Sequence, residues 1–380
     1  MEKKLTIGMA HYSDFHGVYF TIQDIIKELV FNGRRDLLAQ IEFLIVENNG
    51  SDAHAREVKG LAMKHGGLVR VVDLDSKQGT SCAREKIISE ATGNFVLVMD
   101  CHILLCPVVK TIEQLLLFIN YNKDSKDLYT GPLVWDRMNQ VYTHFNDEWG
   151  DGMWGRWGNG WGCVCESFNF SVIQDGKKAQ FVDLVTQERI SECGYCARNF
   201  PDIDFAGHQS KLLDEGYVRI GYNNGEEPFE VFAQGLGLFM TRKNSWLGFN
   251  EDQSGFGGEE CYIHEKYRKN GRKTICLPFL KWLHRFSRPE GVQYSVTGEQ
   301  KLKNYVNEFK ELKLDPKPLK DHFVGHLNFS EEFFNELWSG NKNNSNPKPK
   351  NSDASSLVSQ IETLQKELAK LKGEKCCKKK

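Results

Sequence analysis

The segment from Gly93 to His102 constrains the fold more than any other part of the chain. It reads Gly-Asn-Phe-Val-Leu-Val-Met-Asp-Cys-His, with five consecutive apolar residues between polar ends. A strand without alternation of apolar and polar residues is buried on both faces, which is typical of a parallel sheet covered by helices. Ligands of such sheets bind outside the carboxyl ends of the strands, where this chain carries Asp100 and His102. We therefore expect the functional site at the end of this strand.

Other segments repeat the alternation of strand and helix. Apolar segments at residues 4–10, 41–46 and 68–74 predict strands, and helical spacing of apolar residues follows the first of them at 22–30 and the third at 82–91. Strands that alternate with helices at this spacing predict βαβ units and a parallel sheet. The expected fold class is therefore α/β.

Composition narrows the setting. A length of 380 residues accommodates one large catalytic domain or two smaller ones, and the formal net charge of −2 does not favour nucleic acid as a partner. No run of 18 apolar residues exists, and the first residues read as the start of a strand, so we expect a cytoplasmic protein without a transmembrane segment. In that compartment, the 11 Cys are expected to be free thiols, metal ligands or core residues.

Three motifs carry a family resemblance. They are Val46-Glu47-Asn48-Asn49-Gly50-Ser51-Asp52, then Gln78-Gly79-Thr80-Ser81-Cys82-Ala83-Arg84-Glu85, and then the segment Ala91 to His102. In this order they resemble the family 2 glycosyltransferases of the GT-A fold. Glu85 stands where that family usually has Asn, Glu47 where it has Asp, and Asp-x-His where it has Asp-x-Asp. The last form is similar to that of the polypeptide N-acetylgalactosaminyltransferases.

The resemblance, which covers residues 4–290, implies a Rossmann-like GT-A fold with a mixed, mainly parallel sheet flanked by helices. It also implies a nucleotide-sugar donor, with a UDP-sugar favoured, and a divalent metal, Mn²⁺ or Mg²⁺. The implied donor contacts are Glu47, Asn48, Arg84, Asp100 and Gly237. The implied metal ligands are Asp100, His102 and His284, the last within a segment that resembles the Gly-His-x-x-Arg turn of the N-acetylgalactosaminyltransferases.

A second motif places two carboxylates at the start of a helix. The segment Gly255-Phe256-Gly257-Gly258-Glu259-Glu260 is a Gly-rich turn before a helical pattern. Carboxylates in a first helical turn also favour the helix dipole without any catalytic role, but twin glycines favour close approach of a ligand. The segment resembles the Gly-Gly-Glu-Asp of the same family. The resemblance implies Glu260 as the catalytic base, with Glu259 beside it. This segment and the Ala-Arg motif favour inversion at the anomeric carbon, whereas Asp-x-His and the His284 turn resemble N-acetylgalactosaminyltransferases that retain its configuration.

Tryptophan and cysteine are concentrated in the middle of the chain. Five of the eight Trp lie between Trp135 and Gly162, and we expect Trp154, Trp157 and Trp161 to bind the acceptor by stacking, although packing within a β-rich segment explains them equally well. Four cysteines have a spacing compatible with a structural Zn²⁺, whereas ordinary packing is the more common role of such thiols. They are Cys163, Cys165, Cys193 and Cys196.

The carboxyl-terminal part differs in composition. The expected organisation is a catalytic domain at 1–290, a helical extension at 291–339, a disordered linker at 340–356, a short coiled-coil helix at 357–372 and a basic tail at 373–380. Leu357, Ile361, Leu364, Leu368 and Leu371 form an a/d seam, which predicts self-association or docking on a partner helix.

Together these patterns predict a metal-dependent glycosyltransferase that acts on a hydroxyl acceptor of a cytosolic glycan, a protein or modified DNA. The Trp-rich segment and the ten Lys of residues 341–380 favour DNA, whereas the acidic remainder of the chain does not. Two alternatives stay open. One is a nucleotidyltransferase, although its usual Gly-rich, Lys-containing first loop is replaced by His11-Tyr12-Ser13-Asp14. The other is a non-catalytic scaffold that binds nucleotide, glycan or nucleic acid.

Overall fold

The computed structural model describes residues 3–50, 52–74, 79–135, 141–160, 170–175, 178–183, 189–190, 228–286, 294 and 296–340. The chain divides into two compact units, Met1–Asp315 and Pro316–Lys380, which are described separately. Among the described residues, no helix combines the length and the apolar character that a bilayer crossing needs.

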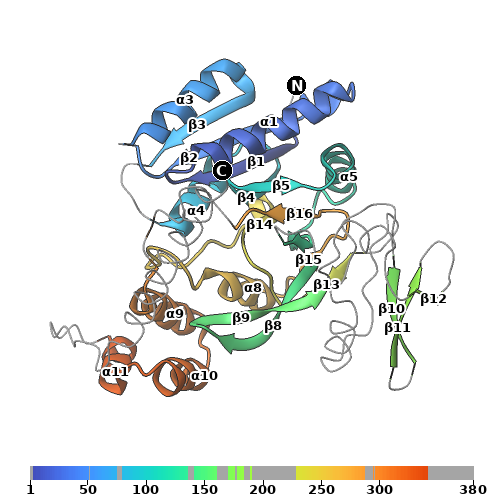
Figure 1. Cartoon of the computed structure of the whole chain (residues 1–380). Helices are drawn as coiled ribbons and strands as arrows, with labels where there is room; N and C mark the ends of the chain where they lie inside the picture. The colour runs from blue at the N-terminus through green and yellow to red at the C-terminus, as the bar shows by residue number, and fades with distance from the viewer. Residues whose placement is uncertain are drawn as a thin grey trace, which may run out of the picture. The chain divides into compact units, whose positions relative to one another are not determined.

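An eight-stranded sheet forms the centre of the first unit (Figure 1), in the order β13-β15-β6-β14-β4-β1-β2-β3. β1 pairs in parallel with both β2 and β4, and β2 with β3, whereas β14 runs antiparallel to β4. The predicted α/β fold with a mixed, mainly parallel sheet is therefore confirmed. The strands are β1 (Leu5–His11), β2 (Ile41–Glu47), β3 (Val69–Asp73), β4 (Phe95–Asp100), β6 (Leu128–Thr130), β13 (Phe229–Glu230), β14 (Leu238–Arg242) and β15 (Thr274–Cys276).

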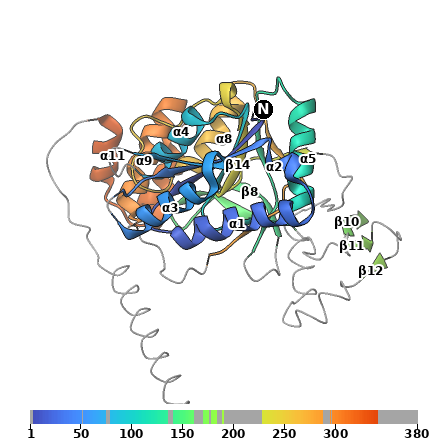
Figure 2. The same ribbon diagram turned by 90° about the horizontal axis from the view of Figure 1, so that it is seen from above.

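Helices cover both faces of this sheet (Figure 2). One hydrophobic cluster joins the sheet to α1, α3 and α5, and a second joins it to α4 and α8. Successive residues of β4 alternate between the clusters, with Leu97 in the first and Val98 in the second. This burial on both faces explains why the segment shows no alternation of polarity. The helices are α1 (Phe15–Phe31), α2 (Arg35–Leu38), α3 (Ala53–His65), α4 (Thr80–Glu90), α5 (Val108–Tyr121), α8 (Glu259–Lys269) and α9 (Gly298–Leu312), with short 3₁₀ turns at Gly66–Leu68 and Lys243–Ser245.

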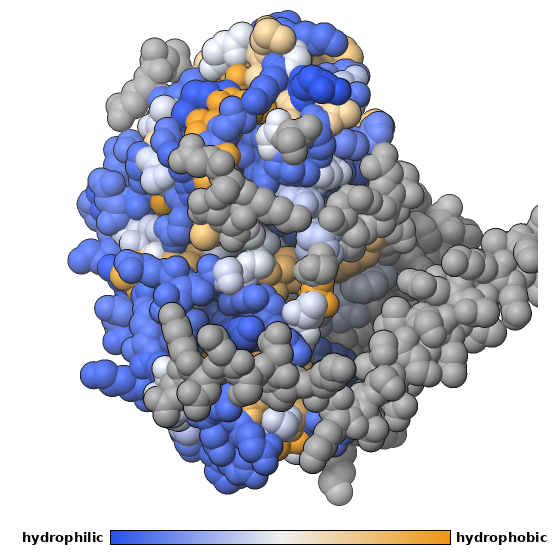
Figure 3. All heavy atoms as spheres, turned by 90° about the vertical axis from the view of Figure 1, so that its left-hand side faces the viewer, coloured by the Kyte–Doolittle hydropathy of each residue, from blue (hydrophilic) through white to orange (hydrophobic). Residues whose placement is uncertain are grey.

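Apolar side chains are concentrated between these layers. The described atoms visible in Figure 3 are mostly hydrophilic, with hydrophobic atoms in small separate patches. Helix α4 lies very close to β1, because an ideal Cβ at Gly8 would lie only 2.1 Å from Cγ2 of Ile87. A glycine at this point of β1 lets α4 approach the sheet, and α4 carries Arg84 into the site.

A second sheet, in the order β5-β16-β7-β8-β9, begins where β4 ends. Its strands are β5 (Ile103–Leu105), β7 (Leu133–Val134), β8 (Val141–Gly150), β9 (Met153–Gly160) and β16 (Trp282–His284). β16 pairs antiparallel with β5, which sets His284 opposite Ile103. This pairing brings the end of β16 beside the end of β4. A small third sheet consists of β10 (Phe170–Asp175), β11 (Lys178–Asp183) and β12 (Arg189–Ile190).

The second unit contains α10 (Pro316–Lys320), a π-helical turn (Asp321–His326) and α11 (Glu331–Ser339). Ser330 caps α11, because its hydroxyl accepts a hydrogen bond from the backbone N–H of Phe333 at 3.0 Å. Helix α9, which the sequence grouped with this extension, belongs to the first unit. The coiled-coil helix at 357–372, the basic tail and all but the first residue of the linker lie outside the described residues.

Candidate active site

Three side chains expected to bind metal meet where β4 ends. Nε2 of His102 lies 3.1 Å from Nε2 of His284, and Oδ2 of Asp100 lies 3.9 Å and 3.8 Å from these two atoms. The two histidines are only 6% and 8% exposed, whereas the Asp100 side chain is 28% exposed. One ligand atom from each residue falls within 4.8 Å of the other two, so the structure brings the three predicted ligands together.

This arrangement fits a divalent cation. Donor atoms that share one ion at about 2.1 Å are separated by roughly 3.0–3.5 Å, close to the spacing between the two imidazole nitrogens. Two imidazoles with one carboxylate suit Mn²⁺ better than Ca²⁺, which prefers oxygen ligands. Burial acts to raise the pKa of Asp100, but the neighbouring His284 and the positive charge of Arg84 outweigh it and lower that pKa. The carboxylate is therefore ionised, as a metal ligand must be.

Arg84 of α4 lies among three carboxyl groups, those of Asp100, Glu259 and Glu260, which form the carboxylate cluster. Its guanidinium donates to Oδ1 of Asp100 at 3.2 Å and to Oε1 of Glu259 at 2.9 Å. It also donates to the carbonyl of Leu236 at 3.0 Å. Burial acts to lower the pKa of Arg84, but the two carboxylates reverse the shift and raise it. Arg84 and Glu259 are almost fully buried, so each charge depends on the other.

Gly237, the residue before β14, contacts Asp100 through its backbone. Its carbonyl accepts a hydrogen bond from the backbone N–H of Asp100 at 2.8 Å. An ideal Cβ at Gly237 would lie 3.0 Å from the ring of Trp282 and 3.5 Å from Oδ2 of Asp100. A side chain here would press on the strand that carries His284.

The turn before α8 places Glu259 and Glu260. Gly257 and Gly258 have φ values of +93° and +111°, which strain any residue other than glycine. Asn304 of α9 fixes the turn, because its amide donates to the carbonyl of Gly257 at 2.7 Å. Glu260 is half-buried, and burial together with the charge of Glu259 raises its pKa to about 7. A carboxyl group that titrates near pH 7 is suited to general base catalysis.

Glu308 of α9 is a further buried carboxyl group beside Glu259 and Glu260. It was not among the residues predicted from the sequence. Glu308 is 1% exposed, and its Oε1 accepts a hydrogen bond from Gln253 at 2.9 Å. Its Oε2 has no hydrogen-bond partner among the described residues. Burial, followed by the charges of Glu259 and Glu260, raises its pKa well above the ordinary value. The available signal was a Glu between the apolar residues Val306 and Phe309 on the buried side of an amphipathic helix.

This burial predicts a pH-dependent stability. Because the folded protein holds the Glu308 proton above pH 4.5 and the unfolded chain releases it, Glu308 destabilises the fold increasingly as pH rises. Glu308→Gln, which stays neutral, is therefore expected to be more stable than the wild type by an amount that grows by up to ~1.4 kcal/mol per pH unit. Urea unfolding at pH 5, 6 and 7 measures the difference. A difference that does not change with pH would show that Glu308 is ionised in the folded protein.

The two predicted donor contacts at the end of β2, Glu47 and Asn48, differ in their surroundings. Glu47 is fully buried; its Oε2 lies 2.5 Å from Nδ1 of His11, and its Oε1 accepts from the backbone N–H of Asn49 at 2.7 Å. Asn48 donates to the carbonyl of Gly79 at 3.1 Å, which joins the end of β2 to the start of α4. Asn48 thus connects these two segments, whereas the Glu47 side chain is held by His11 and Asn49.

A cavity of about 520 Å³ extends from these loops to the metal cluster. Its volume is within the range of small-molecule sites. It collects three of the predicted residues, Asn48, Asp100 and His102. Its walls also include residues that were not predicted, among them His11, Tyr12, Asp14 and Phe256.

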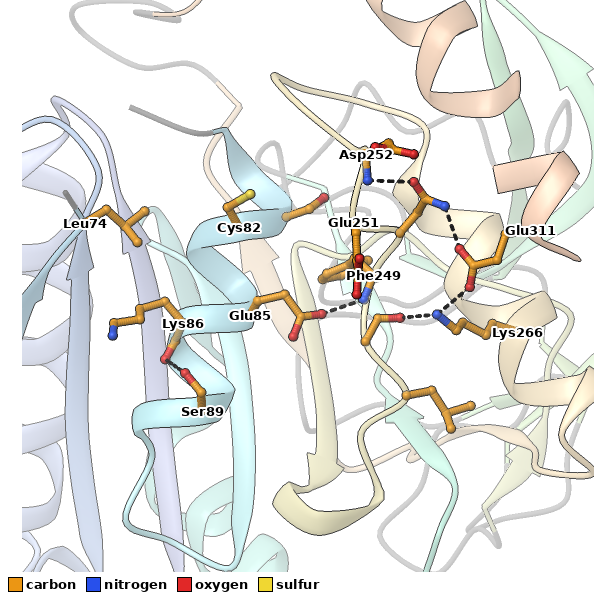
Figure 4. Close-up of a pocket in the computed structure, with 14 residues that line it drawn as sticks. Leu74, Cys82, Glu85, Lys86, Ser89, Phe249, Glu251, Asp252, Lys266 and Glu311 are labelled. Carbon is orange, nitrogen blue, oxygen red and sulfur yellow. Dashed lines mark hydrogen bonds and ion pairs between the residues drawn. The ribbon is translucent and has the colours of Figure 1, made fainter. Parts of the chain in front are cut away.

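A second cavity of about 810 Å³ lies on the outer side of α4 (Figure 4) and contains none of the predicted site residues. Glu85 points from α4 towards Phe249, whose backbone N–H donates to it at 2.5 Å. Lys266 donates to the carbonyl of Gly248 at 2.9 Å and pairs with Glu311 at 2.7 Å. These bonds hold the loop that leads to the Gly-rich turn.

Two of the predicted acceptor residues, Trp154 and Trp157, pack against other aromatic side chains. Trp154 is 7% exposed, donates from its indole to Asp147 at 2.7 Å and stacks on Trp149. Trp157 is half-buried and packs edge-on against Phe145. Trp161 and the four cysteines considered for Zn²⁺ (Cys163, Cys165, Cys193 and Cys196) lie outside the described residues.

One known protein family matches part of the chain. Residues 20–146 match the model of glycosyl transferase family 2, which confirms the predicted resemblance over that segment. No curated protein matches the chain.

Three solved structures illustrate the similarity. GalNAc-T7 with UDP, GalNAc and Mn²⁺ is 16% identical with a TM-score of 0.49, over 88% of this chain and 56% of its own. The mannosyltransferase PcManGT from Pyrobaculum calidifontis, in complex with GDP-Man and Mn²⁺, is 12% identical with a TM-score of 0.43, over 96% of this chain and 81% of its own. S. aureus TarS is 15% identical with a TM-score of 0.25, over 35% of this chain and 21% of its own. The chain thus spans about half the length of the first of them.

Proposed function

We propose, on the premise that residues 20–146 form part of a family 2 glycosyltransferase, that this chain transfers a sugar from a nucleotide-diphosphate sugar to a hydroxyl acceptor in a metal-dependent reaction. A UDP-sugar is the donor we favour. The observation that carries the proposal is the convergence of Asp100, His102 and His284 at the end of β4, beside the 520 Å³ cavity. A cavity at the carboxyl end of parallel strands is suited to a nucleotide, and a divalent ion beside it would neutralise charge on the diphosphate.

In this proposal, Asp100, His102 and His284 hold Mn²⁺ or Mg²⁺. When bound, the ion neutralises the charge that develops on the diphosphate leaving group. Asn48 and Tyr12, at the other end of the cavity, contact the nucleoside. Arg84 keeps Asp100 oriented and adds positive charge near the donor.

Glu260 is the base in the proposed reaction. It accepts the proton of the acceptor hydroxyl as that oxygen attacks the anomeric carbon and the bond from this carbon to the diphosphate breaks. A single displacement of this kind inverts the configuration. Glu259 remains paired with Arg84 and maintains the raised pKa of Glu260 through its charge. Stacking of the acceptor on Trp157 stays a prediction.

The pH dependence of the transfer rate follows from this role. Because Glu260 must be ionised to accept a proton, the rate is expected to rise with pH and to level off above a midpoint of about 7. In Glu259→Gln the negative charge that raises this pKa is removed, so the midpoint is expected to move to lower pH. Initial rates at saturating donor and Mn²⁺ between pH 5 and 9 measure both profiles. Identical midpoints in the two proteins would contradict the assignment.

The experiment that tests the function is a calorimetric titration with UDP, GDP, CDP and TDP, each with and without Mn²⁺. We expect one nucleotide to bind only in the presence of metal, and the binding to be lost in Asp100→Ala/His102→Ala. His65→Ala, on α3 outside the cluster, is the matched control and should bind like the wild type. If no nucleotide binds under any condition, the proposal fails.

The acceptor is then sought among glycans, proteins and DNA with modified bases. A steep loss of activity between 50 and 200 mM salt is expected for DNA, because neutralising its phosphates releases condensed counterions, and is not expected for an uncharged glycan.

A further inference from the structure

Asp14 lies between a helix and a metal ligand. Its Oδ1 accepts a hydrogen bond from the backbone N–H of Gly17 at 3.0 Å and so caps α1. Its Oδ2 lies 3.2 Å from Nδ1 of His102. Gly17 leaves room for this carboxylate, because an ideal Cβ there would lie 2.6 Å from Oδ2 of Asp14. One side chain therefore connects the start of α1 to the metal cluster.

This contact fixes which nitrogen of His102 carries the proton. An ionised carboxylate only accepts hydrogen bonds, so Nδ1 of His102 must be the donor. The other nitrogen, Nε2, then keeps its lone pair directed at the space shared with His284 and Asp100. A histidine binds metal only through a nitrogen that carries no proton.

We propose that Asp14 is a positioning residue that sets the tautomer and the orientation of His102 for metal binding. The inference rests on the proposed function, because it concerns the metal site assigned there. None of the sequence motifs includes Asp14 as a site residue. It lies in the loop after β1, which the sequence analysis used only as evidence against a nucleotidyltransferase.

Two buried residues hold Asp14 in place before any metal is bound. The backbone N–H of Asp14 donates to Nε2 of His11 at 3.1 Å, and Nδ1 of His11 lies 2.5 Å from Oε2 of Glu47. His11 and Glu47 are both fully buried. The acceptor role of Nε2 leaves the proton of His11 on Nδ1, where it is donated to Glu47. This series of contacts joins β2, β1 and the start of α1 to the metal ligand on β4.

The substitution Asp14→Asn separates the two roles of the carboxylate. If the amide oxygen caps α1, the amide NH₂ faces His102 and forces the proton onto the metal-facing Nε2. If the amide is turned round, its NH₂ faces the N–H of Gly17 and the cap is lost. The first orientation keeps a hydrogen bond at each end, whereas the second sets two donors against each other at the helix start, so the first is favoured and the proton of His102 moves to Nε2.

The test is an isothermal calorimetric titration of the full chain with Mn²⁺ alone. For Asp14→Asn we expect Mn²⁺ affinity to fall about 10–100-fold, the usual effect of removing the partner of a ligating histidine. Asp52→Asn is the matched control, because Asp52 caps α3 through Ala55 at 2.8 Å and contacts Ser13 but not His102. Its Mn²⁺ affinity should stay at the wild-type value.

Thermal unfolding in a chelator shows whether the variants are folded. If Asp14→Asn unfolds prematurely, Asp14→Ser replaces it, since Ser also caps helices but is too short to span from Gly17 to His102. It should show the same weakening of Mn²⁺ binding.

The outcomes distinguish the inference from the proposed function. A wild-type chain that does not bind Mn²⁺ overturns both. Wild-type binding with unchanged affinity in Asp14→Asn and Asp14→Ser overturns the role of Asp14 alone. The double variant Asp14→Asn/His102→Ala provides a further check, because it should bind Mn²⁺ no more weakly than His102→Ala. An additional loss in the double variant would mean that Asp14 acts through some other group.

Discussion

Replacing Glu260 with Gln is expected to lower the turnover number of sugar transfer by about 10²–10⁴-fold, the usual contribution of a general base. Gln has the shape of Glu but cannot accept a proton from the acceptor hydroxyl. Glu260 is not among the metal-binding groups, so the affinities for Mn²⁺ and for the nucleotide should be unchanged. The loss should therefore appear in kcat with little change in the KM for the donor.

Glu265→Gln provides the matched control for this experiment. Glu265 lies on the same helix and pairs with Arg268 at 2.8 Å, outside the carboxylate cluster. Its substitution should leave kcat within a factor of two. A Glu260→Gln enzyme that retains more than a tenth of the wild-type kcat would refute the assignment of the base, and Glu259 and Glu308 would then have to be tested in turn.

The largest expected effect on stability comes from Arg84→Met. Arg84 has a side chain that is 5% exposed and pairs with Asp100 and Glu259, the latter 2% exposed. Removing the cation while keeping both anions leaves uncompensated buried charge, which destabilises proteins by about 3–5 kcal/mol. Chemical denaturation at pH 7 measures the change in the free energy of unfolding.

Two further variants show whether burial is the cause. Arg34→Met removes an arginine whose partners Asp36 and Glu113 are 62% and 43% exposed, and we expect a loss far smaller than that of Arg84→Met. Arg84→Met/Glu259→Gln removes one of the stranded charges and should recover part of the stability that Arg84→Met loses. If the double variant is less stable than Arg84→Met, Glu259 is stabilised by groups other than Arg84.

Much of the sheet could be predicted because burial on both faces leaves a local trace. β4 contains five consecutive apolar residues and β2 contains four, and Gly93 precedes β4 while Gly50 follows β2. The three proposed metal ligands were predicted from motif resemblance, and their residues lie near strand ends. Their actual meeting depends on the pairing of β5 with β16, two three-residue strands too short to have a recognisable pattern.

The interactions that support the site could not be predicted in the same way. Asn304 and Glu308 lie on α9, beyond the resemblance, and their contacts with the Gly-rich turn arise only when the chain folds back on itself. Glu47 looked like a ligand contact because of its place after β2. Its burial against His11 is a property of two neighbouring strands, and no spacing along the sequence encodes it.

The pairing of His102 with His284 joins positions 182 residues apart in the chain. In the metal-bound form that we propose, a single ion would therefore act as a reversible cross-link between the two sheets. An ion that binds only the folded state adds stability that rises with the logarithm of its concentration. A shortage of metal would then lower the stability of the protein as well as its activity.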